Sequence, residues 1–209
     1  MLNKLIEKIF RGQFGKPTGL RGKLLARQLN KGNKNQYNAV LENIGIKTND
    51  TILEVGFGNG YLINELFNQN IKIKVYGIDI SEDMLNEAKS KNKHAFKNGD
   101  LKLFVEDISK TSFDEDLFDK IYTVNTLYFW KDINEPFYEI KRILKSGGIF
   151  INVFSVKEHL NTLECTKHGF NKYDLEKVKK TTEANGFNIN KIVEINKNKT
   201  YALISENID

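Results

Sequence analysis

The feature that most constrains the fold is a regular alternation of strand-like and helix-like segments from Thr51 to the end of the chain. Short apolar runs alternate with segments of helical periodicity of about 10–15 residues. Strands separated by helices of that length form βαβ units, in which the strands run parallel and are covered on both faces. The pattern predicts an α/β protein with a doubly wound, mostly parallel sheet.

Seven strands are predicted: Thr51–Val55, Ile73–Ile80, Leu101–Val105, Phe118–Val124, Ile149–Phe154, Ile189–Ile195 and Tyr201–Ser205. The last two have a short connection, which predicts an antiparallel hairpin at the edge of the sheet. Ser81 is predicted to cap the helix that follows the second strand, with Glu82 and Asp83 in its first turn. A helix over Ile133–Leu144 is expected to end at a left-handed glycine cap in the turn of residues 145–148.

The first 45 residues differ in pattern and are predicted to form an N-terminal helical cap or lid over one compact unit of residues 46–209. Apolar residues recur at helical spacing in residues 2–10, 24–29 and 36–43, with a glycine-rich break over residues 11–22. Residues 1–50 hold ten Lys/Arg and three Asp/Glu, a balance of +7 within a chain of net charge +5. A solvated helical face explains this charge, and the alternative is attraction to nucleic acid, anionic lipid or an anionic substrate.

Composition favours a single cytoplasmic domain. A chain of 209 residues suits one α/β domain, and its only cysteine, Cys165, leaves no internal disulfide framework and fits a reducing compartment. No stretch approaches the roughly 20 apolar residues that cross a bilayer, so stable membrane insertion is not expected. Peripheral membrane contact through an amphipathic helix of residues 1–10 stays open. A monomer or a homodimer is expected.

A glycine-rich turn directly follows the first strand. The segment Leu53–Gly60 reads LEVGFGNG, with glycines at positions 56, 58 and 60. Ligands of doubly wound sheets bind beyond the carboxyl ends of the strands, and glycine lets the backbone approach them closely. A dinucleotide site requires G-x-G-x-x-G, but Tyr61 stands where its last glycine would be. The turn therefore predicts a ligand other than a dinucleotide.

Three carboxylates follow or precede the ends of successive strands. Glu54 lies beside the glycine turn, where it would repel a pyrophosphate but suits the cationic amino group of S-adenosylmethionine (SAM). Asp79 ends the second strand, where a carboxylate can accept both hydroxyls of a ribose. Asp107 follows the third strand and suits the exocyclic amine of adenine. Either aspartate could instead be a turn former or a cap, but the combination favours SAM over NAD.

These segments resemble the class I SAM-dependent methyltransferases, in particular the ubiquinone/menaquinone-biosynthesis-like (type 11) group. Besides Glu54–Gly60, the matching stretches are Gly77–Ser81 with Met84-Leu85, Phe118–Ile121 leading to Asn125, and Ile140–Gly148. The resemblance covers residues 37–205 and implies a Rossmann-like methyltransferase fold with strand order 3-2-1-4-5-7-6. It implies SAM as cofactor, S-adenosylhomocysteine as product, and cofactor-binding residues Glu54, Gly56, Gly58, Gly60, Asp79, Ile80, Met84, Asp107, Ile108 and Asn125.

The resemblance also implies a role for individual residues. Asp79 would hold the ribose, Asp107 and the backbone at Ile108 would hold adenine, and Asn125 would lie near the methionine moiety. Met84 would pack either on the adenine ring or in the core. The segment Gly15–Gly22, GKPTGLRG, is similar to the G-x-P-x-G-x-x-G stretch of a less-characterised bacterial subgroup without a settled substrate.

The residues that follow the fourth strand indicate which class of methyl acceptor to expect. Methyltransferases acting on nucleic-acid amines carry Asn/Asp-Pro-Pro-Tyr/Phe at this place, whereas this chain has Thr126 and Leu127 between Asn125 and Tyr128. The departure favours a small-molecule acceptor and argues against a nucleic-acid partner. The alternative is a lipid-like or quinone-like acceptor, or a SAM-binding, membrane-peripheral module without that activity.

Candidates for a general base are few. His168 and Tyr128 are the candidate catalytic residues, although the aromatic side chains at 128–130 fit a pocket wall or the core equally well. His159, Cys165 and His168 make a poor zinc-ligand set because a fourth ligand is missing, so no metal is predicted.

Overall fold

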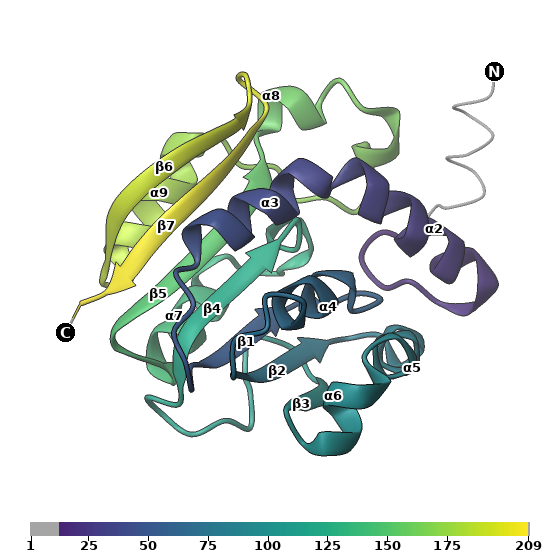
Figure 1. Ribbon diagram of the computed structural model, residues 1–209. Helices are drawn as coiled ribbons and strands as arrows, with labels where there is room; N and C mark the ends of the chain where they lie inside the picture. Colours follow the sequence, from purple (N-terminus) through teal and green to yellow (C-terminus); the bar gives the residue numbers. More distant parts are fainter. Residues whose placement is uncertain (1–12, 209) are drawn as a thin grey trace.

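A seven-stranded sheet crosses the centre of the molecule in the computed structural model, which describes residues 13–208 (Figure 1). Its strands are β1 (Thr51–Val55), β2 (Lys74–Asp79), β3 (Leu101–Val105), β4 (Phe118–Val124), β5 (Leu144–Ser155), β6 (Phe187–Asn196) and β7 (Thr200–Asn207). They are ordered β3-β2-β1-β4-β5-β7-β6, and β7 runs antiparallel to both of its neighbours. The predicted doubly wound sheet, its strand order and the closing hairpin are confirmed. Strand β1 lies between β2 and β4, at the point where the strand order reverses.

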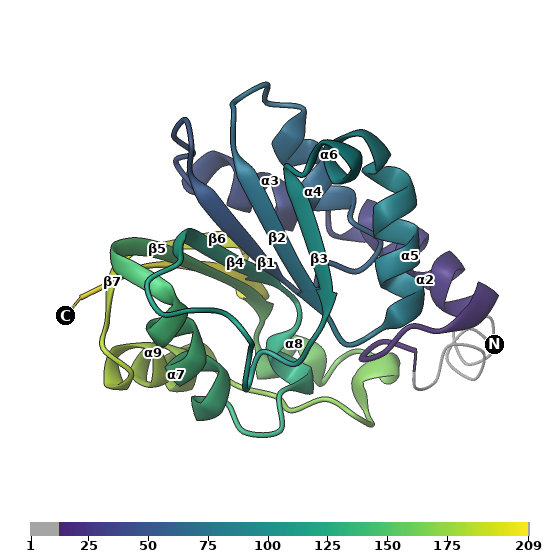
Figure 2. The same cartoon turned by 90° about the horizontal axis from the view of Figure 1, so that it is seen from below.

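Helices cover both faces of the sheet (Figure 2). Helices α3 (Lys34–Asn43), α4 (Tyr61–Phe67), α5 (Glu82–Lys91) and α6 (Lys93–Asn98) lie on one face, and α7 (Asn134–Ile143) and α9 (Leu175–Ala184) lie on the other. Because successive strand residues point to opposite faces, Ile52 and Leu53 of β1 belong to different cores, and both are fully buried. The central parallel strands are therefore held between two apolar layers.

The helix after β2 begins as predicted. The Ser81 hydroxyl accepts a hydrogen bond from the Met84 N–H at 3.4 Å, which caps α5. Asp174 caps α9 in the same way by accepting from the Lys177 N–H at 2.7 Å. Since these side chains satisfy backbone donors left free at a helix start, both helices begin at defined residues.

The end of α7 is a correction. The helix ends at Ile143, and Leu144 is already extended and opens β5, so the glycines at 147 and 148 lie inside a strand and cap no helix. The last helical carbonyls are satisfied instead by residues 116 and 117, whose N–H groups donate to Arg142 and Ile143 at 3.1 and 3.0 Å. A register shift in the β4–β5 pairing accommodates the glycine segment.

The N-terminal segment departs from its prediction in one respect. Helix α2 (Gly19–Gly32) starts inside the stretch predicted as a glycine-rich break, and Gly22 is buried within it. A Cβ at Gly22 would come within 2.7 Å of the Pro17 carbonyl carbon, so the close approach of the two segments requires glycine. The helix predicted for residues 2–10 lies outside the described residues.

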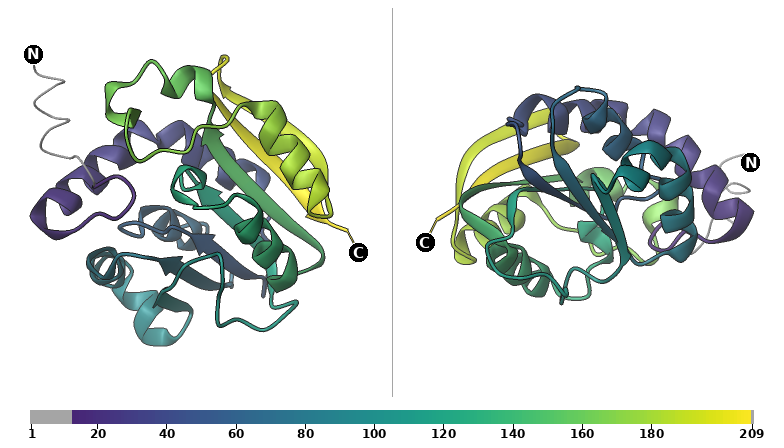
Figure 3. Two further views of the ribbon diagram at one scale, coloured as in Figure 1. Left: turned by 180° about the vertical axis from the view of Figure 1, so that it is seen from behind. Right: turned by 60° about the horizontal axis from the view of Figure 1, so that its bottom comes forward.

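Several short elements were not predicted from the sequence. They are α6, the one-turn helix α8 (Lys157–Leu160), and the 3-10 turns η1 (Leu127–Phe129) and η2 (Glu164–Thr166). Within residues 13–208, no helix combines the length and the apolar character needed to cross a membrane. Helices α2 and α5 lie at the end of the molecule opposite to the β6–β7 hairpin (Figure 3).

Candidate functional site

The glycine turn after β1 adopts a backbone that other residues rarely tolerate. Gly56 and Gly58 have φ values of 76° and 51°. A Cβ at Gly56 would lie 2.3 Å from the Thr126 methyl group, whereas a Cβ at Gly58 would meet no atom within 4 Å. Both glycines line a pocket at the carboxyl ends of β1, β2 and β4. Gly56 is thus required by close packing, and Gly58 leaves space in the pocket for a ligand.

Gly60, the third glycine of the turn, has a different surrounding. It precedes α4 in the left-handed conformation, and a Cβ there would lie 2.7 Å from both the Ala88 methyl group and the Asn92 amide nitrogen. Gly60 is not among the residues that line the pocket within residues 13–208. The close approach of α5 accounts for this glycine.

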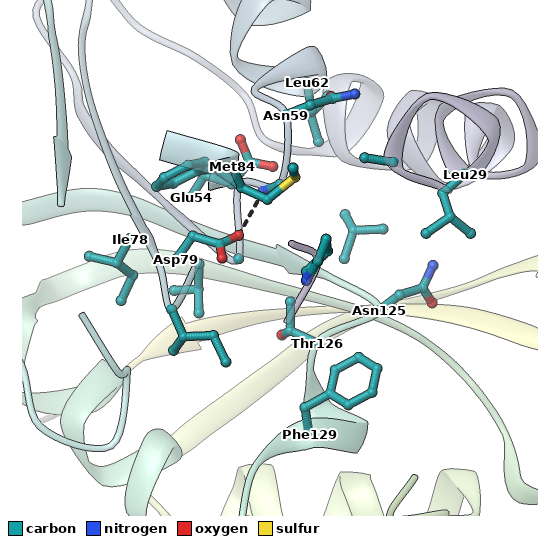
Figure 4. A pocket seen from close by; sticks show the side chains of 18 of the residues that line it. Leu29, Glu54, Asn59, Leu62, Ile78, Asp79, Met84, Asn125, Thr126 and Phe129 are labelled. Atoms are coloured by element: carbon teal, nitrogen blue, oxygen red, sulfur yellow. Dashed lines mark hydrogen bonds between the residues drawn. The ribbon is translucent and has the colours of Figure 1, made fainter. Parts of the chain in front are cut away.

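Asp79 joins the ends of β1 and β2. One of its carboxylate oxygens accepts a hydrogen bond from the Gly58 N–H at 2.8 Å (Figure 4), and the other accepts from the Ser81 N–H at 2.9 Å. Burial raises the pKa of this carboxyl, and the backbone donors oppose that rise. Each carboxylate oxygen has a second lone pair, so Asp79 can still accept hydrogen bonds from a ligand in the pocket.

Glu54 is a buried carboxyl group on β1 that also lines the pocket. It lies opposite Tyr122 of β4 and accepts a hydrogen bond from the Tyr122 hydroxyl at 2.9 Å. Burial raises the pKa of Glu54 well above its ordinary value. No Lys or Arg forms an ion pair with it in the part of the chain that the structure describes. Glu54 is therefore a buried carboxyl group whose desolvation no cation among the described residues offsets.

Four further predicted residues line the same pocket. Asp107 is exposed, and one of its oxygens accepts from the Ser109 N–H at 2.8 Å, which forms the turn that the sequence left as an alternative. Ile108 and Met84 are buried in the two cores and still reach the pocket, and Ile80 is 39% exposed at its rim. The pocket therefore has polar groups at the strand ends and apolar side chains between them.

Asn125 sits directly after β4 with a φ of 59°, and its side chain is held from two sides. Its amide nitrogen donates to Gln36 of α3 at 2.5 Å, and its amide oxygen accepts from the Tyr128 hydroxyl at 3.1 Å. The Tyr128 hydroxyl also accepts from the Ser155 N–H. These contacts hold Asn125 at the pocket wall, beneath α3.

The two candidate catalytic residues lie away from the pocket lining. Tyr128 is 3% exposed, and burial raises its pKa to about 12, so its hydroxyl stays protonated at neutral pH. His168 is exposed in the segment after β5. Neither position suits a general base that acts on a ligand in the pocket. Among residues 13–208, His159, Cys165 and His168 do not form a group that could hold a metal ion.

The N-terminal segment forms the roof of the pocket and contains residues that the sequence did not single out. Its lining side chains are apolar at one end and polar over the glycine turn, and they are Phe14, Pro17, Ala26, Leu29, Asn30, Asn33 and Tyr37. Asn30 donates to the Asn59 side chain at 3.2 Å. The available sequence signal was Gln36, which shares one helix face with the apolar Ala39 and Val40. A polar side chain on such a face becomes buried and needs a hydrogen-bond partner.

The roof is fastened to the start of α5. The Gly19 N–H donates to the Asp83 carboxylate at 2.9 Å, and the Ser81 hydroxyl donates to the Pro17 carbonyl. Lys23 forms an ion pair with Glu87 at 3.0 Å. The Ser81 N–H also donates to Asp79, so Ser81 contacts both the roof and the pocket carboxylate.

We expect this fastening to control proteolysis of the roof. In Asp83→Ala, trypsin should cleave between Arg11 and Lys34 several-fold faster than in the unchanged protein, because the Gly19 N–H loses its charged partner. SAM should slow cleavage in the unchanged protein and less so in the variant. Glu82→Ala removes an exposed acid from the same first helical turn and is the matched control. Equal rates for both variants would rule out the contact as a fastening.

Comparisons with known proteins agree on the class of fold. Residues 53–152 match the family described as a methyltransferase domain. The chain is 32% identical over 108 residues to the uncharacterized methyltransferase YdaC of Bacillus subtilis (strain 168), which covers 52% of this chain and 58% of that protein. The chain thus spans little more than half the length of this curated relative.

Two solved structures extend the likeness to nearly the whole chain. The complex between the Haloferax volcanii Trm112 methyltransferase activator and a putative methyltransferase matches with a TM-score of 0.77 and 18% identity, covering 88% of this chain and 94% of that one. The geranyl diphosphate C-methyltransferase of Streptomyces coelicolor A3(2), bound to Mg²⁺, geranyl diphosphate and S-adenosyl-L-homocysteine, matches with a TM-score of 0.74 and 13% identity, covering 91% and 85%. At these identities the likeness concerns the fold.

Proposed function

We propose that the chain carries a class I, SAM-dependent methyltransferase domain and that the protein transfers a methyl group from SAM to a small, largely apolar acceptor. The observation that carries the proposal is one pocket that joins the glycine turn, the three predicted carboxyl groups (Glu54, Asp79 and Asp107) and an apolar compartment under the roof. The ubiquinone/menaquinone-biosynthesis-like group is the subgroup we propose within that class.

The residues present fit SAM. Asp79 has lone pairs for the ribose hydroxyls, and the buried Glu54 carboxyl suits the cationic amino group. The apolar side chains of Ile80, Met84 and Ile108 suit the faces of adenine, and Asp107 retains a second carboxylate oxygen for its amine. The missing side chain at Gly58 leaves room beside the turn. Gly60 would support this site through packing only.

SAM, when bound, supplies an electrophilic methyl group on a sulfonium centre. What the chain contributes is position, because a methyl displacement requires the acceptor in line and gains much of its rate from orientation. Asn125 is held by Gln36 and Tyr128 at the wall of the pocket and would orient groups next to the methionine moiety. The roof would exclude water from the pocket.

The acceptor compartment favours an apolar ligand. Its walls include Phe14, Leu29, Phe129 and Trp130, and none of these side chains carries a charge. The same feature supports a lipid-like or quinone-like molecule as the second candidate acceptor. A nucleotide base would bring phosphates to a compartment whose aromatic walls offer them no partner. We therefore do not propose nucleic acid as a methyl acceptor.

We propose that residues 1–45 form a lid over the unit of residues 46–209. Support comes from the roof residues, which belong to the first of these segments and line the pocket. A monomer or homodimer would suffice, because every group invoked for SAM comes from one chain.

Binding and transfer assays test the function together. SAM and S-adenosylhomocysteine should bind in calorimetry and NAD should not, because Tyr61 stands where the dinucleotide pattern requires its last glycine. Tritium from labelled SAM should enter apolar small molecules of a cell extract and should not enter DNA, transfer RNA or ribosomal RNA at low salt. Gly58→Arg, which fills the space beside the turn, should abolish any true transfer. NAD binding without SAM binding would exclude the assigned cofactor, and label in nucleic acid would exclude the assigned acceptor class.

A further inference from the structure

The outer face of α2 presents two leucines to solvent. Leu20 and Leu24 are 80% and 59% exposed, one helical turn apart. With Arg27 and Lys31 they follow the spacing i, i+4, i+7 and i+11, which places the four residues in one row along the helix. We call this row the α2 stripe. The opposite face of the helix holds the buried Gly22, Leu25 and Ala26, so the stripe points away from the body of the protein.

The surroundings of the α2 stripe are strongly cationic. Residues 13–41 contain six Lys/Arg and no Asp or Glu. Lys23 and Arg27 approach Glu87 at 3.0 and 3.6 Å. The other four, Lys16, Arg21, Lys31 and Lys34, are exposed and form no ion pair within residues 13–208. An anionic surface would therefore find several cations available.

Charge and apolar exposure together distinguish between anionic partners. Cations alone fit nucleic acid and lipid headgroups equally well. Single exposed leucines are ordinary, but two leucines in the middle of a cationic helix face are typical of a helix that lies in a membrane interface. Phosphate backbones offer no apolar region for Leu20 and Leu24, whereas a bilayer offers the boundary between headgroups and acyl chains. The combination favours lipid.

We propose that the α2 stripe docks on the surface of a bilayer that contains anionic lipids. Leu20 and Leu24 enter the headgroup boundary, and Arg21 and Lys31, unpaired among the described residues, contact the anionic headgroups. Helix α2 lies at one end of the molecule (Figures 1 and 3), where a flat surface can approach it. The inner face of the same helix contributes Leu29 and Asn30 to the pocket. Docking therefore brings the roof of the acceptor compartment to the bilayer, a consequence that rests on the proposed function.

Vesicle sedimentation with the full chain tests the docking. The vesicles are phosphatidylcholine alone or an equal mixture of phosphatidylcholine and phosphatidylglycerol. The unchanged protein should sediment with the mixed vesicles. The double variant Leu20→Gln/Leu24→Gln should partition at least about tenfold more weakly, since it loses the burial of two apolar side chains. Arg21→Gln/Lys31→Gln should lose about tenfold as well, and only on the anionic vesicles. Tyr138→Gln removes a 68% exposed aromatic side chain from α7 and is the matched control.

The outcomes separate docking from catalysis. Thermal unfolding and SAM affinity should be the same in all these variants, because the stripe residues are exposed and line no part of the pocket. If the leucine variant bound mixed vesicles as tightly as the unchanged protein, the α2 stripe would not be the docking surface. Absence of vesicle binding by the unchanged protein would also overturn the proposal, as would leucine-independent binding to a DNA duplex in its place. None of these results depends on methyl transfer.

Discussion

Replacing Asp79 with alanine is expected to weaken SAM binding by about 1–3 kcal/mol, the scale of hydrogen bonds to a charged group, or by a factor of about 5–150. The carboxylate is the proposed acceptor for the ribose hydroxyls, and it also holds the Gly58 and Ser81 N–H groups at 2.8 and 2.9 Å. Alanine therefore removes ligand contacts and leaves two donors of the pocket wall without their partner. Titration calorimetry gives the affinity, and thermal unfolding without ligand gives the loss of stability.

Two further variants make the Asp79 result interpretable. Asp79→Asn keeps the size of the side chain but turns one acceptor into a donor that faces an N–H group, so it should lie between alanine and the unchanged protein. Asp114→Ala removes an exposed acid outside the pocket and should change neither measurement. Full SAM affinity in Asp79→Ala would reduce Asp79 to a turn former, the alternative that the sequence left open.

Glu54→Gln should have opposite effects on stability and on binding. Without ligand, the buried Glu54 carboxyl has a raised pKa because burial penalises its charged form. The folded state therefore binds the proton more tightly than the unfolded chain does. The resulting stability is complete below the ordinary pKa of 4.5 and is lost as the pH rises from there through the folded pKa.

Glutamine removes this loss, so the variant should be more stable than the unchanged protein at neutral and higher pH. It also removes the proposed partner of the cationic amino group, so SAM should bind at least about tenfold more weakly. Denaturant unfolding across pH and calorimetry measure the two effects. Glu65→Gln makes the same change on α4 outside the pocket lining and should leave both unchanged.

The same carboxyl links SAM binding to protons. A cationic amino group beside Glu54 favours its ionised form, so binding should release a proton wherever the free protein holds Glu54 protonated. The affinity should then rise with pH up to the raised pKa of the free protein. Calorimetry in two buffers with different ionisation enthalpies measures the proton directly. If SAM binding released no proton and Glu54→Gln were no more stable than the unchanged protein, Glu54 would not be protonated in the free protein, and this prediction would be wrong.

Much of the fold could be predicted because its signals are local. The strands β1, β3 and β4 have the bounds that the apolar runs indicated. The glycine turn could be located because its backbone excludes side chains. The end of α7 could not be placed, since glycines can cap a helix or relieve a strand, and the choice depended on the pairing of Leu144 with Phe118.

The candidate site divides in the same way. The sequence placed Glu54, Asp79 and Asn125 at strand ends, and all three line one pocket. Tyr128 was chosen for its chemistry and its place after β4, but packing turned it inward to the Asn125 and Ser155 groups. Tyr122 was not singled out, because its importance lies in a hydrogen bond to a residue 68 positions away.

What the sequence determined by itself was therefore the succession of elements, the carboxyl groups at the strand ends and the class of ligand they suit. These follow from periodicity, glycine sterics and charge, which act within a few residues. Only the tertiary structure decided that Gly60 makes room for α5 while Gly58 lines the pocket, and that α2 and α3 roof this pocket. Those outcomes depend on contacts between side chains that are distant in the sequence. Loop closure and core packing determine such contacts, and local conformational preferences do not.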